Sequence, residues 1–116
     1  MQLDQEGLPR VRALALRLPE VTEKSCYGTQ AFYVAGKIFA RMHELPGVLV
    51  LWRASQEERR ILLDSEPEAF FITEHYRNHN HVLARLKFLD DAELGELLAE
   101  AWLVRAPSRL NLPEEV

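Results

Sequence analysis

The sequence has a single cysteine, Cys26, and no apolar run close to the roughly 20 residues that a membrane-spanning helix needs. One cysteine excludes an intramolecular disulfide and agrees with a reducing compartment. The start of the chain carries Asp4 and Glu6 where a secretory leader would carry positive charge followed by an apolar core. The sequence also lacks a glycine-rich phosphate loop and a Gly-x-Ser-x-Gly elbow. We therefore expect a cytoplasmic protein with no membrane partner and no cofactor.

An excess of positive charge is also missing. The formal net charge of −4 argues against a dedicated nucleic-acid binder, because phosphate affinity needs clustered Lys and Arg. The charges are unevenly placed, however, with acidic residues in the predicted helices. The basic residues in or beside the predicted strands are Lys24, Lys37, Arg41, Arg53, Arg77, Arg85 and Lys87. One face can thus be basic while the whole chain is acidic.

The length of 116 residues suits one domain, residues 1–116, in which residues 106–116 are expected to form a loose tail. Three segments have the apolar spacing of helices. The first covers residues 8–18 and has a proline in its first turn. The second follows the capping box of residues 55–58 and ends near Ser65. The third begins at Asp90, and its apolar stripe comprises Leu94, Leu97, Leu98, Ala101 and Trp102.

Strands are predicted between these helices. Residues 31–34 and 37–43 are joined by the two-residue turn Ala35-Gly36, and residues 48–53 follow a Pro-Gly type II turn at residues 45–48. Residues 70–73 and 81–87 form the remaining pair. Residues 20–29 are interpreted as a connection with at most a short strand. The order α-β-β-β-α-β-β-α predicts an α+β fold with two layers, an antiparallel sheet covered by helices.

Tight turns would also fix the register of this sheet. They place Arg41 opposite Trp52 and Phe32 opposite Phe39, with all four side chains on one face. The other face is more uniformly apolar and is therefore predicted to be the helix-covered side. Its members are Tyr33, Ile38, Ala40, Met42, Leu49 and Leu51.

The stretch from Phe70 to Lys87 is the predicted functional edge, because it places a histidine-rich loop between two strands. Imidazole is a common metal ligand, but asparagines interrupt the helical spacing, so a hydrogen-bonded loop is favoured over a metal site. Cys26 near a histidine would suit nucleophilic catalysis, although an unreactive cysteine is the simpler interpretation. We therefore predict no metal site and no catalytic residue, and expect a protein that is not an enzyme. Cations alternating with aromatic residues suit phosphate contact and base stacking, but also a soluble sheet surface. The predicted ligand-binding residues are Lys37, Arg41, Trp52, Tyr76, Arg77, His79, His81 and Arg85.

Several segments together resemble the MmcQ/YjbR family. They are Leu18-Pro19-Glu20-Val21-Thr22-Glu23, Gly36-Lys37-Ile38-Phe39-Ala40, Phe70-Phe71-Ile72-Thr73 with His75-Tyr76, and Trp102 late in the last helix. The resemblance covers nearly the whole chain. It implies helices packed on an antiparallel sheet, similar to secretion chaperones and described as CyaY-like. It also implies a proposed role in DNA binding.

The sequence supports two hypotheses that belong to different classes of function. The first is a non-enzymatic binding domain for DNA. The second is a module that binds a peptide, another subunit or a small ligand, with exposed Phe39 and Trp52 as anchors. The first predicts that His79 and His81 gain charge as the pH falls from about 7.5 to 6, which would strengthen binding of an anion.

Overall fold

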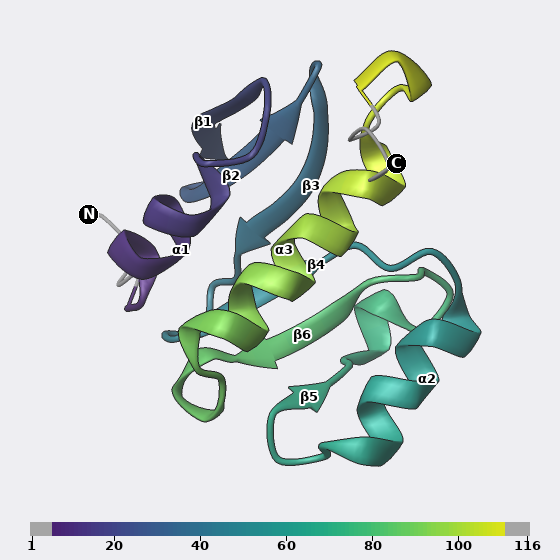
Figure 1. The fold of residues 1–116 in the computed structure, drawn as a ribbon. Helices are drawn as coiled ribbons and strands as arrows, with labels where there is room; N and C mark the ends of the chain where they lie inside the picture. Colours follow the sequence, from purple (N-terminus) through teal and green to yellow (C-terminus); the bar gives the residue numbers. More distant parts are fainter. Residues whose placement is uncertain (1–5, 111–116) are drawn as a thin grey trace.

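The computed structural model describes residues 6–110. Within these residues, three α-helices accompany a six-stranded antiparallel sheet of order β1-β2-β3-β4-β6-β5. The elements are α1 (Leu8–Ala15), β1 (Val21–Cys26), β2 (Thr29–Val34), β3 (Lys37–Met42), β4 (Val48–Leu51), α2 (Gln56–Ser65), β5 (Phe70–Phe71), β6 (Val82–Arg85) and α3 (Asp91–Arg105). Helices α1 and α3 lie across one face of the sheet, and α2 lies beside its β5 end (Figure 1). The predicted α+β fold is confirmed.

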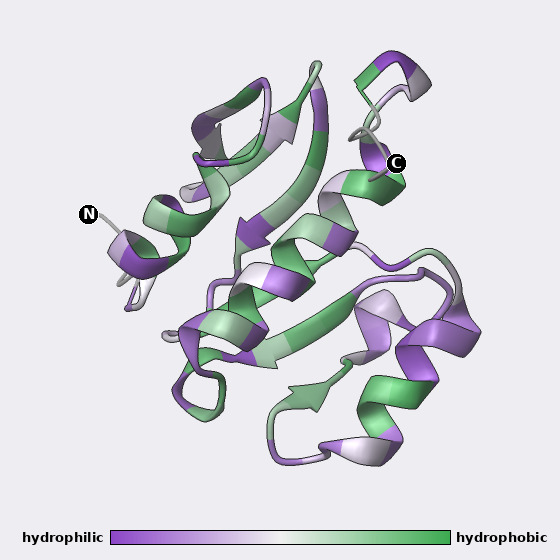
Figure 2. Cartoon of the chain, viewed as in Figure 1, coloured by the Kyte–Doolittle hydropathy of each residue, from purple (hydrophilic) through white to green (hydrophobic). Residues whose placement is uncertain are grey.

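The core lies between this face and helices α1 and α3. The predicted stripe of α3 is fully or nearly fully buried, and the indole Nε1 of Trp102 donates to the Pro19 carbonyl at 2.9 Å. This bond ties the last helix to the connection that follows α1. Strand β6 is largely apolar, whereas much of α2 is hydrophilic (Figure 2). Because α3 has only 15 residues and is interrupted by charges, no helix in residues 6–110 can cross a membrane.

Two of the three predicted helices, α2 and α3, begin with side-chain caps. The Ser55 hydroxyl accepts from the Glu58 amide at 3.1 Å, and the Asp90 carboxylate accepts from the Glu93 amide at 2.8 Å. These bonds satisfy backbone donors that the first helical turn leaves free. Each helix therefore begins where its side-chain chemistry indicates.

The strand β1 is the main departure from the predicted order. Val21–Cys26 pairs along its whole length with β2, whereas the sequence indicated a connection with at most a short strand. Its side chains are exposed or only half-buried, because β1 is an edge strand covered on neither side by a complete layer. A strand of this kind lacks the clear apolar alternation from which strands are recognised. Pairing with β2, more than burial, holds it in place.

The predicted turns are present, but the register differs from the predicted one. Val34 faces Lys37 as expected, with Gly36 at φ 82°, a left-handed conformation that favours glycine. An irregularity between Phe32 and Tyr33 then shifts the ladder, so that Phe32 faces Ala40 instead of Phe39. The next hairpin has a longer loop than expected, and Arg41 therefore faces Val50 instead of Trp52.

These shifts correct the predicted faces. Ala40, Met42, Leu49 and Leu51 are buried beneath the helices as predicted. Phe32 and Phe39, predicted on the other face, are also fully buried there because the bulge turns both toward the helices. Tyr33 and Ile38 are only half-buried and pair with each other away from this core, so their predicted place under the helices is wrong.

We call the opposite side of the sheet the second face. One cross-strand row defines it across all six strands: Lys24, Ala31, Arg41, Val50, Leu83 and Phe71. At the C-terminal end of the described chain, Ala106 and Leu110 pack against the core. The expected loose tail is therefore attached as far as Leu110, and its remainder lies outside the described residues.

Candidate anion-binding surface

A short segment folds over the second face where β4 and β6 meet. Residues 74–76 form a 3-10 helix that places Tyr76 against Val48, Val50 and Leu83, with 6% of the tyrosine exposed. The phenol hydroxyl accepts from Nη2 of Arg41 at 2.8 Å. A buried tyrosine needs such a partner for its hydroxyl. The part of the second face at Val48, Val50 and Leu83 is thus covered by the chain itself.

Arg41 is held by internal partners. Besides Tyr76, its guanidinium donates to Thr29 Oγ1 at 3.3 Å, to the Met42 carbonyl at 3.2 Å and to Glu44 Oε1 at 3.0 Å. Burial opposes its charged form, but hydrogen bonds to Tyr76 and Glu44 outweigh burial and raise the Arg41 pKa. Its donors are therefore engaged within the protein and are poorly placed to contact a phosphate.

Arg59 holds the histidine-rich loop through hydrogen bonds to its backbone. It extends from α2, is only 6% exposed, and donates to the carbonyls of Tyr76 (2.8 Å), Arg77 (3.2 Å), His79 (2.6 Å) and His81 (3.2 Å). Burial without a carboxylate partner lowers the Arg59 pKa. The rigid fork of the guanidinium can serve several acceptors at once, so one side chain fixes the path of residues 76–81.

All four histidines of the chain lie around Tyr76. Their ring centroids are 4.7 Å (His75), 5.5 Å (His81), 6.1 Å (His79) and 6.4 Å (His43) from the centroid of Tyr76. Within residues 6–110, no group of three or more His, Cys, Asp or Glu side chains is arranged to hold a metal ion. The cluster packs aromatic rings together on the second face.

His81 is the most deeply placed of these histidines. Its ring lies 3.9 Å from that of Trp52, and its Nδ1 is buried without a hydrogen-bond partner. Burial, together with the nearby charges of His79, Arg105, Arg59 and Arg41, lowers the His81 pKa to about 4. The prediction that His81 gains charge between about pH 7.5 and 6 is therefore wrong.

The structure divides the predicted ligand-binding residues into separate groups. Arg41, Trp52, Tyr76, His79 and His81 meet in the cluster around Tyr76. Arg77 is exposed beside this cluster and pairs with Glu74 at 3.0 Å. Lys37 is exposed at the start of β3, and Arg85 lies at the end of β6 that pairs with Val48. They do not form one continuous site.

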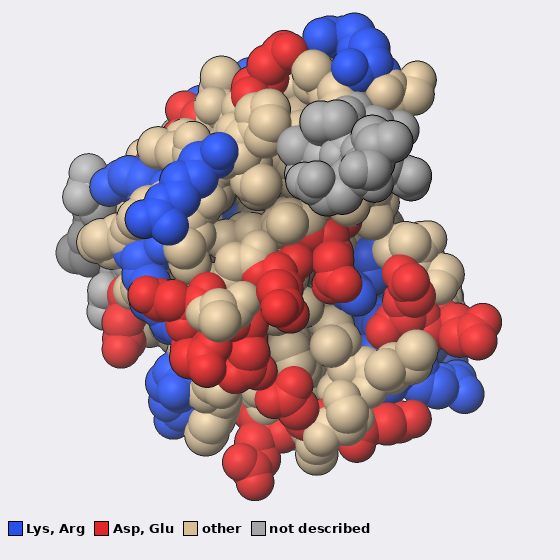
Figure 3. Space-filling model, in the orientation of Figure 1, with Lys and Arg blue, Asp and Glu red and all other residues tan. Residues whose placement is uncertain are grey.

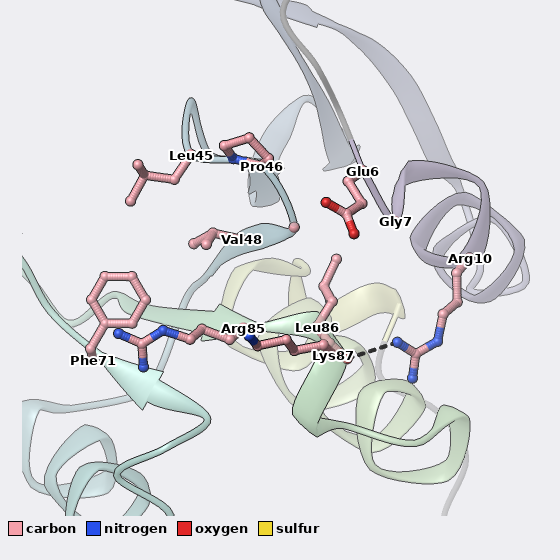
Figure 4. Close-up of a pocket in the computed structure, with 11 residues that line it drawn as sticks. Glu6, Gly7, Arg10, Leu45, Pro46, Val48, Phe71, Arg85, Leu86 and Lys87 are labelled. Atoms are coloured by element: carbon pink, nitrogen blue, oxygen red, sulfur yellow. Dashed lines mark hydrogen bonds between the residues drawn. The ribbon is translucent and has the colours of Figure 1, made fainter.

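Arg85 belongs instead to a cleft of about 570 Å³. Its guanidinium carbon lies 4.1 Å from the ring centroid of Phe71, and its Nη1 donates to the Glu68 carbonyl at 2.9 Å. Figure 4 shows Arg85 and Lys87 along one side of the cleft and Leu45 and Val48 along the other. The cleft therefore joins an apolar lining to two basic side chains.

Arg10 lines the far end of the same cleft but is already engaged. Its guanidinium binds Asp91 Oδ1 at 2.6 Å, the Leu86 carbonyl at 2.9 Å and the Leu89 carbonyl. These bonds connect α1 to the segment between β6 and α3. Each of the three nitrogens of Arg10 thus already makes a hydrogen bond within the protein, and the side chain builds the wall of the cleft.

Sequence reasoning missed Arg59, His43 and the cleft. Arg59 had a usable signal, because Arg59, Leu62 and Leu63 share one helical face and a basic residue on that face needs internal acceptors. His43 had none, since only the register of β3 brings it toward Tyr76. The cleft is formed by segments far apart in the chain, and no local sequence pattern predicts it.

Charged side chains are unevenly placed on the molecule, and both signs are present on the helix-bearing side (Figure 3). Acidic side chains gather over α2 and α3 on the helix-bearing side (Figure 3). They include Glu57, Glu58, Asp64, Asp91, Glu93, Glu96 and Glu100. The defining row of the second face contains Lys24 and Arg41 and no acidic residue, and Arg85 lies beside it.

The comparisons with known proteins agree with this fold. A family model named YjbR matches residues 16–104. The chain belongs to the YjbR family. It is 38% identical over 65 residues to uncharacterized proteins of Mycobacterium bovis and Mycobacterium tuberculosis, covering 55% of this chain and 50% of theirs. This YjbR-family chain thus spans about half the length of the curated relatives it matches.

A solved structure is similar over the whole chain. The crystal structure of Deinococcus radiodurans protein DR2400, with a DUF419 family-model domain, matches at a TM-score of 0.75 and 20% identity, covering 100% of this chain and 96% of that one. At this identity the likeness concerns the fold alone. It supports the arrangement of helices on a six-stranded sheet in the YjbR-family chain.

Proposed function

We propose that this chain is a non-enzymatic binding domain that contacts the phosphates of duplex DNA with basic side chains of its second face. The basic side chains of the second face carry the proposal, because Lys24 and Arg41 lie in a row without acidic residues and Arg85 lies beside it, whereas acidic residues gather over α2 and α3. A domain with a net charge of −4 can still attract an anion to one basic side. Arg41 no longer belongs to the contact set, since its donors are engaged internally.

The contact set spans a long distance. Lys24 on β1 and Arg85 on β6 are separated by four strand spacings of about 4.8 Å, roughly 19 Å in all. An extended anion can reach both, whereas a small ligand cannot. Lys87 and Arg77 add exposed charge near the β6 end and beside the histidine cluster.

A duplex suits this surface better than a single strand. Stacking of unpaired bases requires exposed aromatic faces. Phe32 and Phe39 are fully buried, Tyr76 is 6% exposed, and Trp52 lies beneath the His81 ring. Phosphate contacts, which do not depend on base stacking, remain possible at Lys24, Arg85 and Lys87.

A salt series with a fluorescent duplex and a matching single strand tests the proposal. We expect the duplex to bind more tightly, with affinity falling steeply between about 50 and 200 mM salt as counterions are released. Arg60→Glu on the acidic side provides a control that changes the net charge by the same amount as Arg85→Glu. Absence of duplex binding at low salt, or equal losses for these two variants, would refute the assignment.

The non-enzymatic part of the proposal rests on the internal use of the candidate catalytic groups. Burial and the neighbouring Cys26 thiol raise the pKa of Tyr33, and the histidines pack around Tyr76. The alternative of a protein-binding sheet face loses one expected anchor, because Phe39 is 0% exposed. The small-ligand alternative gains support from the cleft beside Arg85.

A further inference from the structure

The cleft beside Arg85 combines features of a small-molecule site. Its volume of about 570 Å³ falls in the range of about 300–1,000 Å³ that is typical of such sites. Its walls come from the start of α1, the turn before β4, strand β5 and the end of β6. Figure 4 shows these side chains converging on one hollow.

The basic side chains of the cleft are not neutralised by carboxylates of the described residues. Six arginines form ion pairs with carboxylates: Arg10, Arg12, Arg41, Arg53, Arg77 and Arg109. In the described part of the chain, Arg85 and Lys87 have no such pair. Arg85 directs one nitrogen to the Glu68 carbonyl and stacks on Phe71, which orients the guanidinium while other donors stay available.

The apolar part lies next to these charges. Leu45 is 48% exposed, so about half of its apolar side chain faces the open cleft. Val48 and the half-buried ring of Phe71 continue the same lining. An apolar group that covered Leu45 and Phe71 would remove the exposed apolar surface of both from water, which favours binding.

Glu6 limits the charge that the cleft accepts. Its side chain is among the lining residues and points into the space between α1 and the turn at Gly47 (Figure 4). A second anionic group at that end would be repelled. The cleft therefore favours one anionic head near Arg85 and Lys87 and an uncharged body.

We propose that this cleft binds a small molecule with an apolar body and a single anionic head, either a carboxylate or a phosphate monoester. The head contacts Arg85 and Lys87, and the body lies against Leu45, Val48 and Phe71. This site goes beyond DNA binding, because it needs neither the row through Lys24 nor an extended anion. The two functions share Arg85 and Lys87, whereas Lys24 belongs to the DNA contacts alone and Leu45, Val48 and Phe71 belong to the cleft alone.

The test uses 3-phenylpropionate as the probe in a titration followed by amide NMR, with phenyl phosphate as a second arm. We expect saturable shifts at residues 45, 47, 48, 71 and 85–87 at millimolar probe. The neutral analogue 3-phenylpropanol and the bodiless anion acetate should bind at least about tenfold more weakly, because each lacks half of the interaction. The tighter of the two anionic arms identifies the head group.

Arg85→Gln should weaken 3-phenylpropionate by about tenfold or more, and Lys87→Gln should weaken it by less. Arg77→Gln, an exposed arginine outside the cleft, is the matched control and should leave the affinity unchanged. The same spectra report whether each variant is folded. Shifts absent for both anionic probes, equal affinity for 3-phenylpropanol, or equal losses for Arg85→Gln and Arg77→Gln would each overturn the site, whatever the outcome with DNA.

Discussion

The histidine-rich loop and the Arg85 cleft are two regions with opposite use of their polar groups. In the loop, Arg59 and Arg41 bind backbone carbonyls, a tyrosine hydroxyl and a carboxylate of the protein itself. In the cleft, Arg85 and Lys87 have no carboxylate partner among the described residues and face a hollow. The loop contains the histidines, which often occur in functional sites, yet the cleft has the basic side chains that are available to an anionic ligand.

This difference shows that the type of a residue indicates function less well than whether its hydrogen-bond donors are already used within the protein. A buried guanidinium that is fully hydrogen-bonded stabilises a structure, and its removal leaves acceptors unsatisfied. An oriented guanidinium with free donors can bind a ligand at little ordering cost. The two regions should therefore respond to mutation in different ways.

The largest effect should separate two neighbouring phenylalanines. Phe70 is 2% exposed in the helix-side core, so Phe70→Ala should lower the free energy of unfolding by about 3–5 kcal/mol. Phe71 is half-buried in the cleft, and Phe71→Ala should lower it by only about 1–2 kcal/mol. Urea denaturation measures both. Similar losses for the two variants would mean that Phe71 belongs to the core and not to a ligand cleft.

Removal of the Arg59 guanidinium should have the next largest effect. Arg59→Ala leaves four loop carbonyls without their donor and should lower the free energy of unfolding by about 2–3 kcal/mol. Arg60→Ala, at the exposed neighbouring position, should change it by less than about 0.5 kcal/mol. Hydrogen exchange should also rise at residues 76–81 in the first variant. Equal stabilities would contradict the structural role of Arg59.

A smaller loss is expected at the tyrosine hydroxyl. Tyr76→Phe removes the acceptor of the 2.8 Å bond from Arg41 and should lower the free energy of unfolding by about 1 kcal/mol. Tyr27→Phe is the control, because Tyr27 is 94% exposed at the turn between β1 and β2. If thermal unfolding shows no difference between the two, the Arg41–Tyr76 bond does not stabilise the loop.

Acidification should reveal the buried state of His81. Its pKa of about 4 lies below the usual value of 6.5, so the unfolded chain binds its proton first. The stability that neutral His81 contributes is present above about pH 6.5 and is lost as the pH falls toward about 4. His81→Phe keeps a ring against Trp52 but cannot titrate, and its stability should fall less steeply over this range. Parallel curves for the two proteins would show that His81 is accessible to protons.

The sequence was most informative where local chemistry decides structure. The caps at Ser55 and Asp90, the stripe of α3 and the turns at Gly36 and Pro46 were all predictable. The bulge at Phe32 was not, because it depends on how β2 and β3 fit together. That single irregularity moved Phe32 and Phe39 to the buried side and removed an expected anchor.

For the site, the sequence indicated the correct residues of the cluster around Tyr76 but not their role. Whether Arg41 or His81 is available depends on partners from β2, β3, α2 and α3 that no local pattern connects. Arg85 was predicted as a ligand-binding residue, but its neighbours Leu45 and Lys87 in the cleft were not. Spatial convergence of distant segments explains both omissions.

Binding of duplex DNA by two multiple variants tests the central claim most directly. One variant combines Lys24→Gln, Arg85→Gln and Lys87→Gln, and the other combines His75→Asn and His79→Asn in the loop. We expect wild type to bind at low salt. The first variant should bind more weakly, with a log–log salt slope smaller by about one per lost phosphate contact, and the second should bind as wild type does. Wild-type binding that survives the first set of changes and disappears with the second would contradict this claim.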